Sequence, residues 1–197
     1  MLEKTLENLL KTALLPIGKT MYIYGGGWNE KDTGAGIEAM TLGIDPKWAE
    51  FAQKQDSSYN FKDYDYKQNK EYIHLGLDCS GYIGWLLYNI FQDKGYVDFS
   101  RKIANNLATE NKGKVKKAKY ITEYKAGDIM SGESVSHVWL SLGPCNDGSV
   151  VILHSSPSGV HISGTPTPKG IENSHAIDLA NKYMDKYYPV WNKKLSC

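Results

Sequence analysis

The chain has 197 residues, of which 41% are hydrophobic and 12% aromatic, and its formal charge is +1 from 23 basic and 22 acidic side chains. A chain of this length can bury about 70% of its unfolded surface, so one compact domain is expected. The balanced charge argues against nucleic acid as a partner. The three cysteines form no C-x-x-C pair, so neither a disulfide framework nor a structural zinc site is indicated, and no cofactor is expected.

Residues 1–15 predict an amphipathic helix that ends near Pro16 and Gly18. Apolar side chains form one face of it, while acidic and basic side chains form the other. The acidic residues argue against a secretory signal peptide, and no apolar run reaches the roughly 18 residues needed to cross a bilayer. We therefore expect a helix over about residues 1–18 that packs on the domain, and no transmembrane segment.

A long polar segment follows a glycine turn. Residues 21–24 alternate and run into Gly25-Gly26-Gly27, which predicts a short extended segment entering a tight, close-packed turn. Residues 28–76 then form an aromatic-rich insertion, with short helical signals around residues 36–42 and after Asp45-Pro46. The tyrosines and charges of this insertion either line a substrate cleft or belong to a solvated surface loop.

A buried helix is predicted from about Ser80 to Asp93, with Cys79 at its N-terminus. Its apolar residues recur at helical spacing, and they are Ile83, Leu86, Leu87, Ile90 and Phe91. Short apolar runs separated by turn residues follow, and they predict antiparallel strands over residues 128–130, 137–142, 150–154 and 160–163.

The turn former Asn146-Asp147-Gly148 lies between the second and third of these runs. We therefore expect the strands that carry His137 and His154 to be hairpin partners. A helix near residues 174–184 and a last extended piece around residues 187–191 complete the prediction. The expected fold class is α+β, with the buried helix packed on an antiparallel sheet in a single domain over residues 1–197.

Cys79 is a candidate nucleophile. A free thiol has a pKa near 8.5 and is largely protonated at neutral pH, so a catalytic cysteine needs a local positive field. A helix N-terminus supplies about half a positive charge, and a neighbouring histidine could hold the sulfur as a thiolate–imidazolium pair. Both sources are expected to lower the pKa of Cys79. A hairpin would also let His154 hydrogen-bond His137, which is the general arrangement of nucleophilic triads.

Other interpretations of these three residues stay open. Cys79 is also compatible with a small buried residue at a helix start, and each histidine with a structural role. A metal site made from Cys79, His137 and His154 is a further alternative, although the spacings match no compact zinc motif. The remaining histidines, His74, His161 and His175, show no comparable context and are expected to be surface or core residues.

Six short motifs, taken in chain order, resemble those of the NlpC peptidase family. Its members are bacterial murein endopeptidases with a compact papain-like α+β fold. The resemblance covers about residues 20–27 and 76–165. The motifs are Tyr22-Ile23-Tyr24-Gly25-Gly26, Asp78-Cys79-Ser80-Gly81, Ala126-Gly127-Asp128-Ile129-Met130, Ser136-His137-Val138, Leu153-His154-Ser155-Ser156 and Gly159-Val160. The Asp-Cys-Ser-Gly element followed by an apolar helix is the most specific of them.

The resemblance implies a cysteine peptidase that cuts the γ-D-glutamyl bond to a diamino acid, with a peptidoglycan stem peptide or muropeptide as partner. Cys79 would be the nucleophile, His137 the base, and His154 the group that orients the base. Tyr22 falls on the family's active-site tyrosine. Asp78 and Ser80 would hold the ammonium of a free L-alanine end, and both also sit where a helix needs capping groups.

The sequence departs from the family pattern at three places. Tyr24 stands where tryptophan is usual, Trp139 stands where glycine is common and is expected to narrow the cleft, and the segment from about Trp28 to Leu77 is much longer than usual. That segment is expected to influence substrate choice.

Two alternative functions remain: an amidase of the related CHAP type, acting on the sugar–peptide amide or a cross-bridge, and a non-catalytic cell-wall-binding module. Murein lies outside the cytoplasmic membrane, so two locations stay open. One is a secreted or cell-wall location, reached after removal of a signal peptide or by another route of delivery. The other is a cytoplasmic location, with a role in recycling muropeptides. The diamino acid and the oligomeric state are left open.

Overall fold

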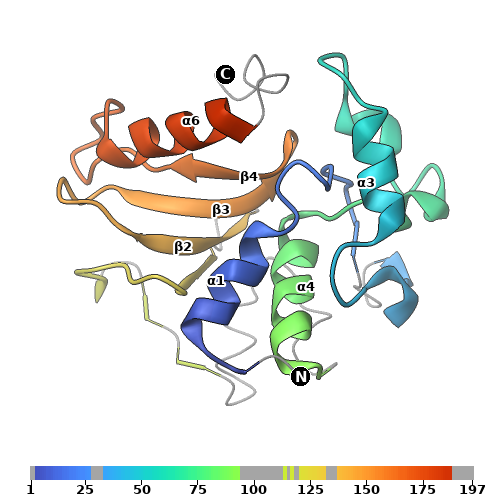
Figure 1. Ribbon diagram of the computed structural model, residues 1–197, viewed down its shortest axis with the longest axis horizontal. Helices are drawn as coiled ribbons and strands as arrows, with labels where there is room; N and C mark the ends of the chain where they lie inside the picture. Colours follow the sequence, from blue (N-terminus) through green and yellow to red (C-terminus); the bar gives the residue numbers. More distant parts are fainter. Residues whose placement is uncertain are drawn as a thin grey trace.

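Four consecutive strands form one antiparallel sheet in the order β1-β2-β3-β4 (Figure 1). The computed structural model describes residues 3–27, 33–93, 113–114, 116–117, 120–131 and 137–187. The strands are β1 (Ile129–Ser131), β2 (Val138–Pro144), β3 (Val150–Ser156) and β4 (Gly159–Gly164). Each of the four apolar runs is therefore a strand, β2 and β3 are hairpin partners, and the predicted α+β class is confirmed.

The register of the sheet separates an apolar face from a face that carries histidines. Leu153 of β3 pairs with Leu140 of β2 and with Ile162 of β4. Successive residues of a strand point to opposite faces, so His154 and its partner His161 lie on the face away from these apolar side chains. The apolar face forms the core with helices α4 and α6.

Helix α4 (Cys79–Phe91) is the central buried element and packs on β2 and β3. Tyr82 and Trp85 of this helix are fully buried. Helix α1 (Leu6–Leu14) lies beside it, and the Tyr82 hydroxyl donates to the carbonyl of Ala13 at 2.8 Å. α1 ends earlier than the expected helix over residues 1–18, because Pro16 has no N–H to continue the hydrogen-bond ladder.

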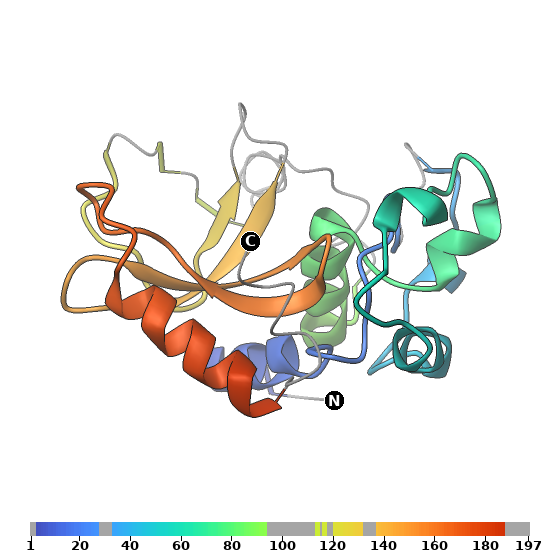
Figure 2. The same ribbon diagram turned by 90° about the horizontal axis from the view of Figure 1, so that it is seen from above.

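Helix α6 (His175–Tyr187) covers β4 and β3 (Figure 2). It agrees with the helix predicted over residues 174–184. The extended piece expected around residues 187–191 is wrong at Tyr187, which is helical, and its other residues lie outside the described part of the chain. Within the described residues, no helix has the length and apolar content needed to span a membrane.

The described part of the insertion, residues 33–76, lies on the other side of α4 from the sheet (Figures 1 and 2). It contains α3 (Pro46–Gln53) and the 3-10 helices η1 (Ile37–Ala39), η2 (Phe61–Tyr64) and η3 (Lys70–His74). Asp45 caps α3 by accepting the N–H of Lys47 at 2.8 Å, as predicted. The indole N–H of Trp85 donates to the carbonyl of Gly43 at 2.9 Å, which fastens this segment to α4.

An aromatic cluster holds the second half of the insertion together. Tyr59 and Tyr64 stack with ring centroids 5.5 Å apart, and Phe51 meets Tyr64 edge-on at 4.9 Å. Tyr72 extends the cluster from η3. Such ring contacts stabilise beyond the area they bury, so this part of the insertion is packed by its own side chains.

Candidate active site

The start of α4 is positioned by close contacts between glycine backbones. The N–H of Asp78 donates to the carbonyl of Gly26 at 3.1 Å. A Cβ on Gly81 would lie 2.0 Å from the same carbonyl oxygen, and a Cβ on Gly26 would lie 2.5 Å from the carbonyl oxygen of Gly76. Only glycine permits such an approach, so the predicted close-packed turn is confirmed. The contact brings the Tyr22 segment next to Cys79.

Asp78 is the N-cap of α4. Its Oδ1 accepts the N–H of Gly81 at 2.7 Å and the hydroxyl of Ser80 at 2.9 Å. Burial raises the pKa of this carboxyl, while these hydrogen bonds oppose the shift. The capping role of Asp78 is thus present, and Ser80 is bound to the cap itself.

Cys79 lies against the end of the sheet at which β2 begins and β3 ends. The hydroxyl of Ser155, near the end of β3, donates to the carbonyl of Leu77 at 2.7 Å. The backbone N–H of Val138, at the start of β2, lies close enough to the Cys79 sulfur to lower its pKa. His137 directly precedes Val138, and consecutive Cα atoms are about 3.8 Å apart. The fold therefore brings His137 to the start of α4.

The protonation states of this pair differ from the sequence-based expectation. Burial, followed by the charge of the neighbouring Asp78, raises the pKa of Cys79 to about 12, although the N–H groups of Val138, Ser80 and Cys79 itself act against the shift. Burial also lowers the pKa of His137. The expected lowering of the cysteine pKa is therefore wrong for this state, because desolvation outweighs the helix N-terminus. Both shifts favour the uncharged form, so the Cys79 thiol and the His137 imidazole are neutral at pH 7.

His137 and His154 are hydrogen-bonded, as the hairpin predicted. Nε2 of His137 lies 2.7 Å from Nδ1 of His154, and Nε2 of His154 lies 2.8 Å from the hydroxyl oxygen of Ser163. Burial, together with the neighbouring histidines, lowers the pKa of His154 well below its ordinary value. Both ring nitrogens of His154 are thus engaged by protein groups.

Two further residues lie at this site that were not predicted from the sequence, His161 and Ser163. His161 is buried, its ring centroid lies 4.5 Å from that of His154, and its Nδ1 bonds the carbonyl of Gly159 at 2.8 Å. The expected surface or core position is confirmed for His161, which is a core residue, but its contact with His154 was not predicted. The signal was available: Pro157-Ser158 forms a two-residue turn, and counting back from it pairs His154 with His161. We call His137, His154 and His161 the histidine row.

Tyr22 is half-buried beside the same helix start. Burial raises its pKa well above the ordinary value, and the charges of Asp78 and Cys79 add to the shift. Its ring meets Phe61 edge-on with centroids 5.4 Å apart, and its carbonyl accepts a hydrogen bond from the Tyr59 hydroxyl. Two aromatic residues of the insertion therefore hold Tyr22 in place.

Trp139 and Tyr24, two of the three departures from the family pattern, also lie on the described part of the chain. The Trp139 ring centroid is 5.4 Å from that of His137, and its indole N–H donates to the sulfur of Met130 at 3.0 Å. Trp139 thus packs beside His137, and the expected narrowing of a cleft stays a prediction. Tyr24 is 43% exposed and stacks on Tyr66.

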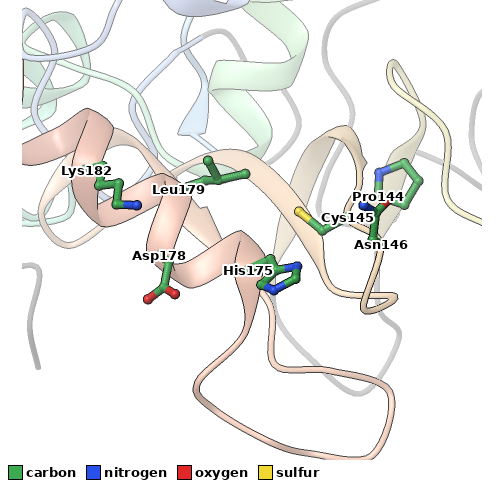
Figure 3. Close-up of a pocket in the computed structure, with 7 residues that line it drawn as sticks. All are labelled: Pro144, Cys145, Asn146, His175, Asp178, Leu179 and Lys182. Carbon is green, nitrogen blue, oxygen red and sulfur yellow. The ribbon is translucent and has the colours of Figure 1, made fainter.

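Cys145 lies away from the site around Cys79. It lines an open hollow between the β2–β3 turn and α6, together with His175 and Asp178 (Figure 3). This hollow lies at the end of β2 opposite His137. Cys145 is a free thiol outside the Cys79 site, so its substitution is a control for substitution of Cys79. Cys197 and Ser136 lie outside the described residues.

A metal site made from Cys79, His137 and His154 does not fit the geometry. The facing nitrogens of the two histidines bond each other rather than converge on a shared point, and Ser163 occupies the other nitrogen of His154. Within the described ranges, no group of three or more His, Cys, Asp or Glu side chains is arranged to hold a metal ion.

The fold and the site define an α+β protein with a buried cysteine at a helix start and a histidine pair at the adjoining end of the sheet. No protein-family model, no curated protein and no solved structure matches this chain. The evidence for a function therefore lies in the motifs of the chain and in the geometry of its site.

Proposed function

We propose that this chain is a papain-like cysteine peptidase of the NlpC type, which hydrolyses γ-D-glutamyl bonds to a diamino acid in bacterial cell-wall peptides. The observation that supports it most is the 2.7 Å contact between Nε2 of His137 and Nδ1 of His154, at the sheet end that meets Cys79. This contact leaves Nδ1 of His137 available for the thiol. Cys79 is the nucleophile, His137 the base, and His154 the orienting residue.

The reaction follows two steps in which His137 carries the proton. As the Cys79 sulfur attacks the carbonyl carbon, Nδ1 of His137 takes the thiol proton and then gives it to the leaving amine nitrogen. A thioester remains on the sulfur. His137 next removes a proton from water, which attacks the thioester, and the proton returns to the departing sulfur. Because thiol and imidazole are both neutral beforehand, the proton transfer accompanies the attack on the substrate.

Groups around the sulfur have further roles in this proposal. The backbone N–H of Cys79, at the helix start, is a hydrogen-bond donor for the oxyanion. The Tyr22 hydroxyl, whose pKa burial raises further above its ordinary value near 10, stays protonated and is a second donor. Asp78 and Ser80 lie beside the sulfur and are the candidates for holding the ammonium of a free L-alanine end. Their mutual hydrogen bond orients the carboxylate for this contact.

The test is hydrolysis of L-alanyl-γ-D-glutamyl-diaminopimelate and of intact sacculi, followed by mass analysis. We expect a newly exposed diamino-acid amine, with Cys79→Ala and His137→Ala each reducing the rate by about 10⁴-fold or more. Cys145→Ala is the matched control, because that thiol lies at the opposite end of β2 and should leave the rate unchanged.

Each of the other possible outcomes would support a different function. Release of a lactyl carboxyl would replace the peptidase by an amidase of the CHAP type. Binding to sacculi without cleavage would replace it by a cell-wall-binding module. Cleavage of the soluble peptide alone would indicate a role in recycling muropeptides. Full activity of Cys79→Ala would overturn the mechanism.

A further inference from the structure

We propose that Ser163 is a positioning residue, whose hydroxyl oxygen holds the proton of His154 on Nε2 and thereby leaves Nδ1 of His137 free for the Cys79 thiol. The consequence for catalysis depends on the function proposed above. The tautomers themselves are properties of the folded chain and can be measured without turnover.

The contacts allow only two arrangements of protons. A neutral imidazole has one N–H and one acceptor nitrogen, so the 2.7 Å contact between His137 and His154 holds a single proton. In the first arrangement, Nε2–H of His137 donates to Nδ1 of His154, and Nε2–H of His154 donates to Ser163. In the second, the Ser163 hydroxyl donates to Nε2 of His154, and Nδ1–H of His154 donates to Nε2 of His137.

Only the first arrangement gives a working base. In the second, the proton of His137 is on Nδ1, and Nε2 is occupied by His154, so no nitrogen can take the thiol proton. The role of Ser163 in the first arrangement is to accept, since its oxygen lies 2.8 Å from Nε2 of His154. The side chain of Ser163 is partly exposed, so its own proton can be donated to solvent.

The β3–β4 hairpin fixes the position of this serine. Ser163 pairs with Ile152 and His161 pairs with His154, so Ser163 and His161 lie on the same face of the sheet as His154. His161 is buried, its ring is packed 4.5 Å from the ring of His154, and the carbonyl of Gly159 holds its Nδ1. These contacts limit rotation of the His154 ring, so its Nε2 stays directed at Ser163.

Removal of the serine oxygen should change the balance between tautomers. Ser163→Ala removes the partner of His154 Nε2 in both arrangements, leaving an unpaired N–H in the first and an unpaired acceptor nitrogen in the second. Because a buried N–H without an acceptor is the less tolerated of the two, the first arrangement is penalised more. Ser163→Thr keeps a hydroxyl and suits a strand, so it should restore the first arrangement. Ser158→Ala, in the turn of the same hairpin, is the control for a general effect of losing a serine hydroxyl.

The decisive measurement is long-range proton–nitrogen correlation NMR on ¹⁵N-histidine-labelled protein above pH 7, with the rings assigned by single substitutions. We expect wild type, Ser163→Thr and Ser158→Ala to carry the protons of His137 and His154 on Nε2. In Ser163→Ala, a substantial fraction of His154 should move its proton to Nδ1. A wild-type His154 protonated on Nδ1, or tautomers that Ser163→Ala leaves unchanged, would overturn the proposal.

Kinetics of the same variants test the consequence for the reaction. Ser163→Ala should lower kcat by about tenfold or more with little change in KM, since a wrong tautomer of the base costs up to about 10⁴-fold in a serine protease triad. Ser163→Thr should recover most of the rate. An unchanged kcat in a variant with shifted tautomers would contradict the positioning role. Absence of hydrolysis by wild type with the expected tautomers would instead count against the proposed function alone.

Discussion

Gly81→Ala tests whether the glycine contacts position the start of α4. A Cβ at this residue would lie 2.0 Å from the carbonyl oxygen of Gly26, whereas real Cβ contacts essentially never fall below 3.0 Å. The two backbones would have to separate by about 1 Å, which strains the hydrogen bond from Asp78 to Gly26. Overpacking of this kind costs about 1–3 kcal/mol, and the strained hydrogen bond about 1 kcal/mol more.

A gain in helix propensity opposes this cost. Alanine is better than glycine inside a helix by about 0.5–1 kcal/mol, so an unstrained Gly81→Ala would be stabilising. The net expectation is a loss of about 1–3 kcal/mol, which lowers the Tm by about 2–12 °C for a chain of this length.

The assay is thermal and urea unfolding of Gly81→Ala and of the matched variant Gly36→Ala. A Cβ on Gly36 would also meet atoms, at 2.2 Å, but they belong to the flexible carboxylate of Glu38, which can move aside. We expect Gly36→Ala to change stability by no more than about 0.5 kcal/mol. A Gly81→Ala protein as stable as wild type, or more stable, would refute the reasoning about the backbone contact.

Three further predictions concern the site. Burial holds the pKa of His154 and His161 below the unfolded value of 6.5, so the unfolded chain binds more protons and stability should fall as the pH decreases below about 6.5. His161→Gln should reduce this slope in urea unfolding, and an equal slope would contradict the assignment. Phe61→Ala removes the ring that packs on Tyr22 and should slow peptide hydrolysis about tenfold by displacing that tyrosine, whereas a wild-type rate would exclude a positioning role. In the unliganded protein, iodoacetamide should modify Cys79 with a rate that keeps rising with pH beyond pH 8, measured against Cys79→Ala, because burial raises the thiol pKa. A rate plateau below pH 6 would reveal a preformed ion pair instead.

The elements that carry Cys79 and the histidine pair were predictable from local patterns. Apolar residues at helical spacing predicted a helix from about Ser80 with Cys79 at its N-terminus, and α4 begins at Cys79 itself. The Asn146-Asp147-Gly148 turn fixed β2 and β3 as partners, which was enough to predict that His137 meets His154. Periodicity and turn chemistry act over a few residues, so a single sequence displays them.

What was missed depends on contacts between distant parts of the chain. The thiol pKa is set by burial of α4 against the sheet, a tertiary effect that outweighs the local helix N-terminus. The hydrogen bond from Tyr59 to the Tyr22 carbonyl joins two irregular segments, which have no periodicity to place them together. Ser163 could be placed beside His154 only from the register of β4, because a shift of one residue would turn its side chain to the other face of the sheet.

The aromatic cluster of the insertion has a consequence for the energetics of recognition. Phe51, Tyr59 and Tyr64 already contact one another, and Tyr59 is tied to the segment beside Cys79. A ligand that lies against this aromatic cluster meets side chains whose rotamers are already fixed, so association costs less conformational entropy than it would on a mobile loop. Selectivity at such a rigid surface would arise from the complementary shapes of the ligand and the aromatic cluster, with little induced fit.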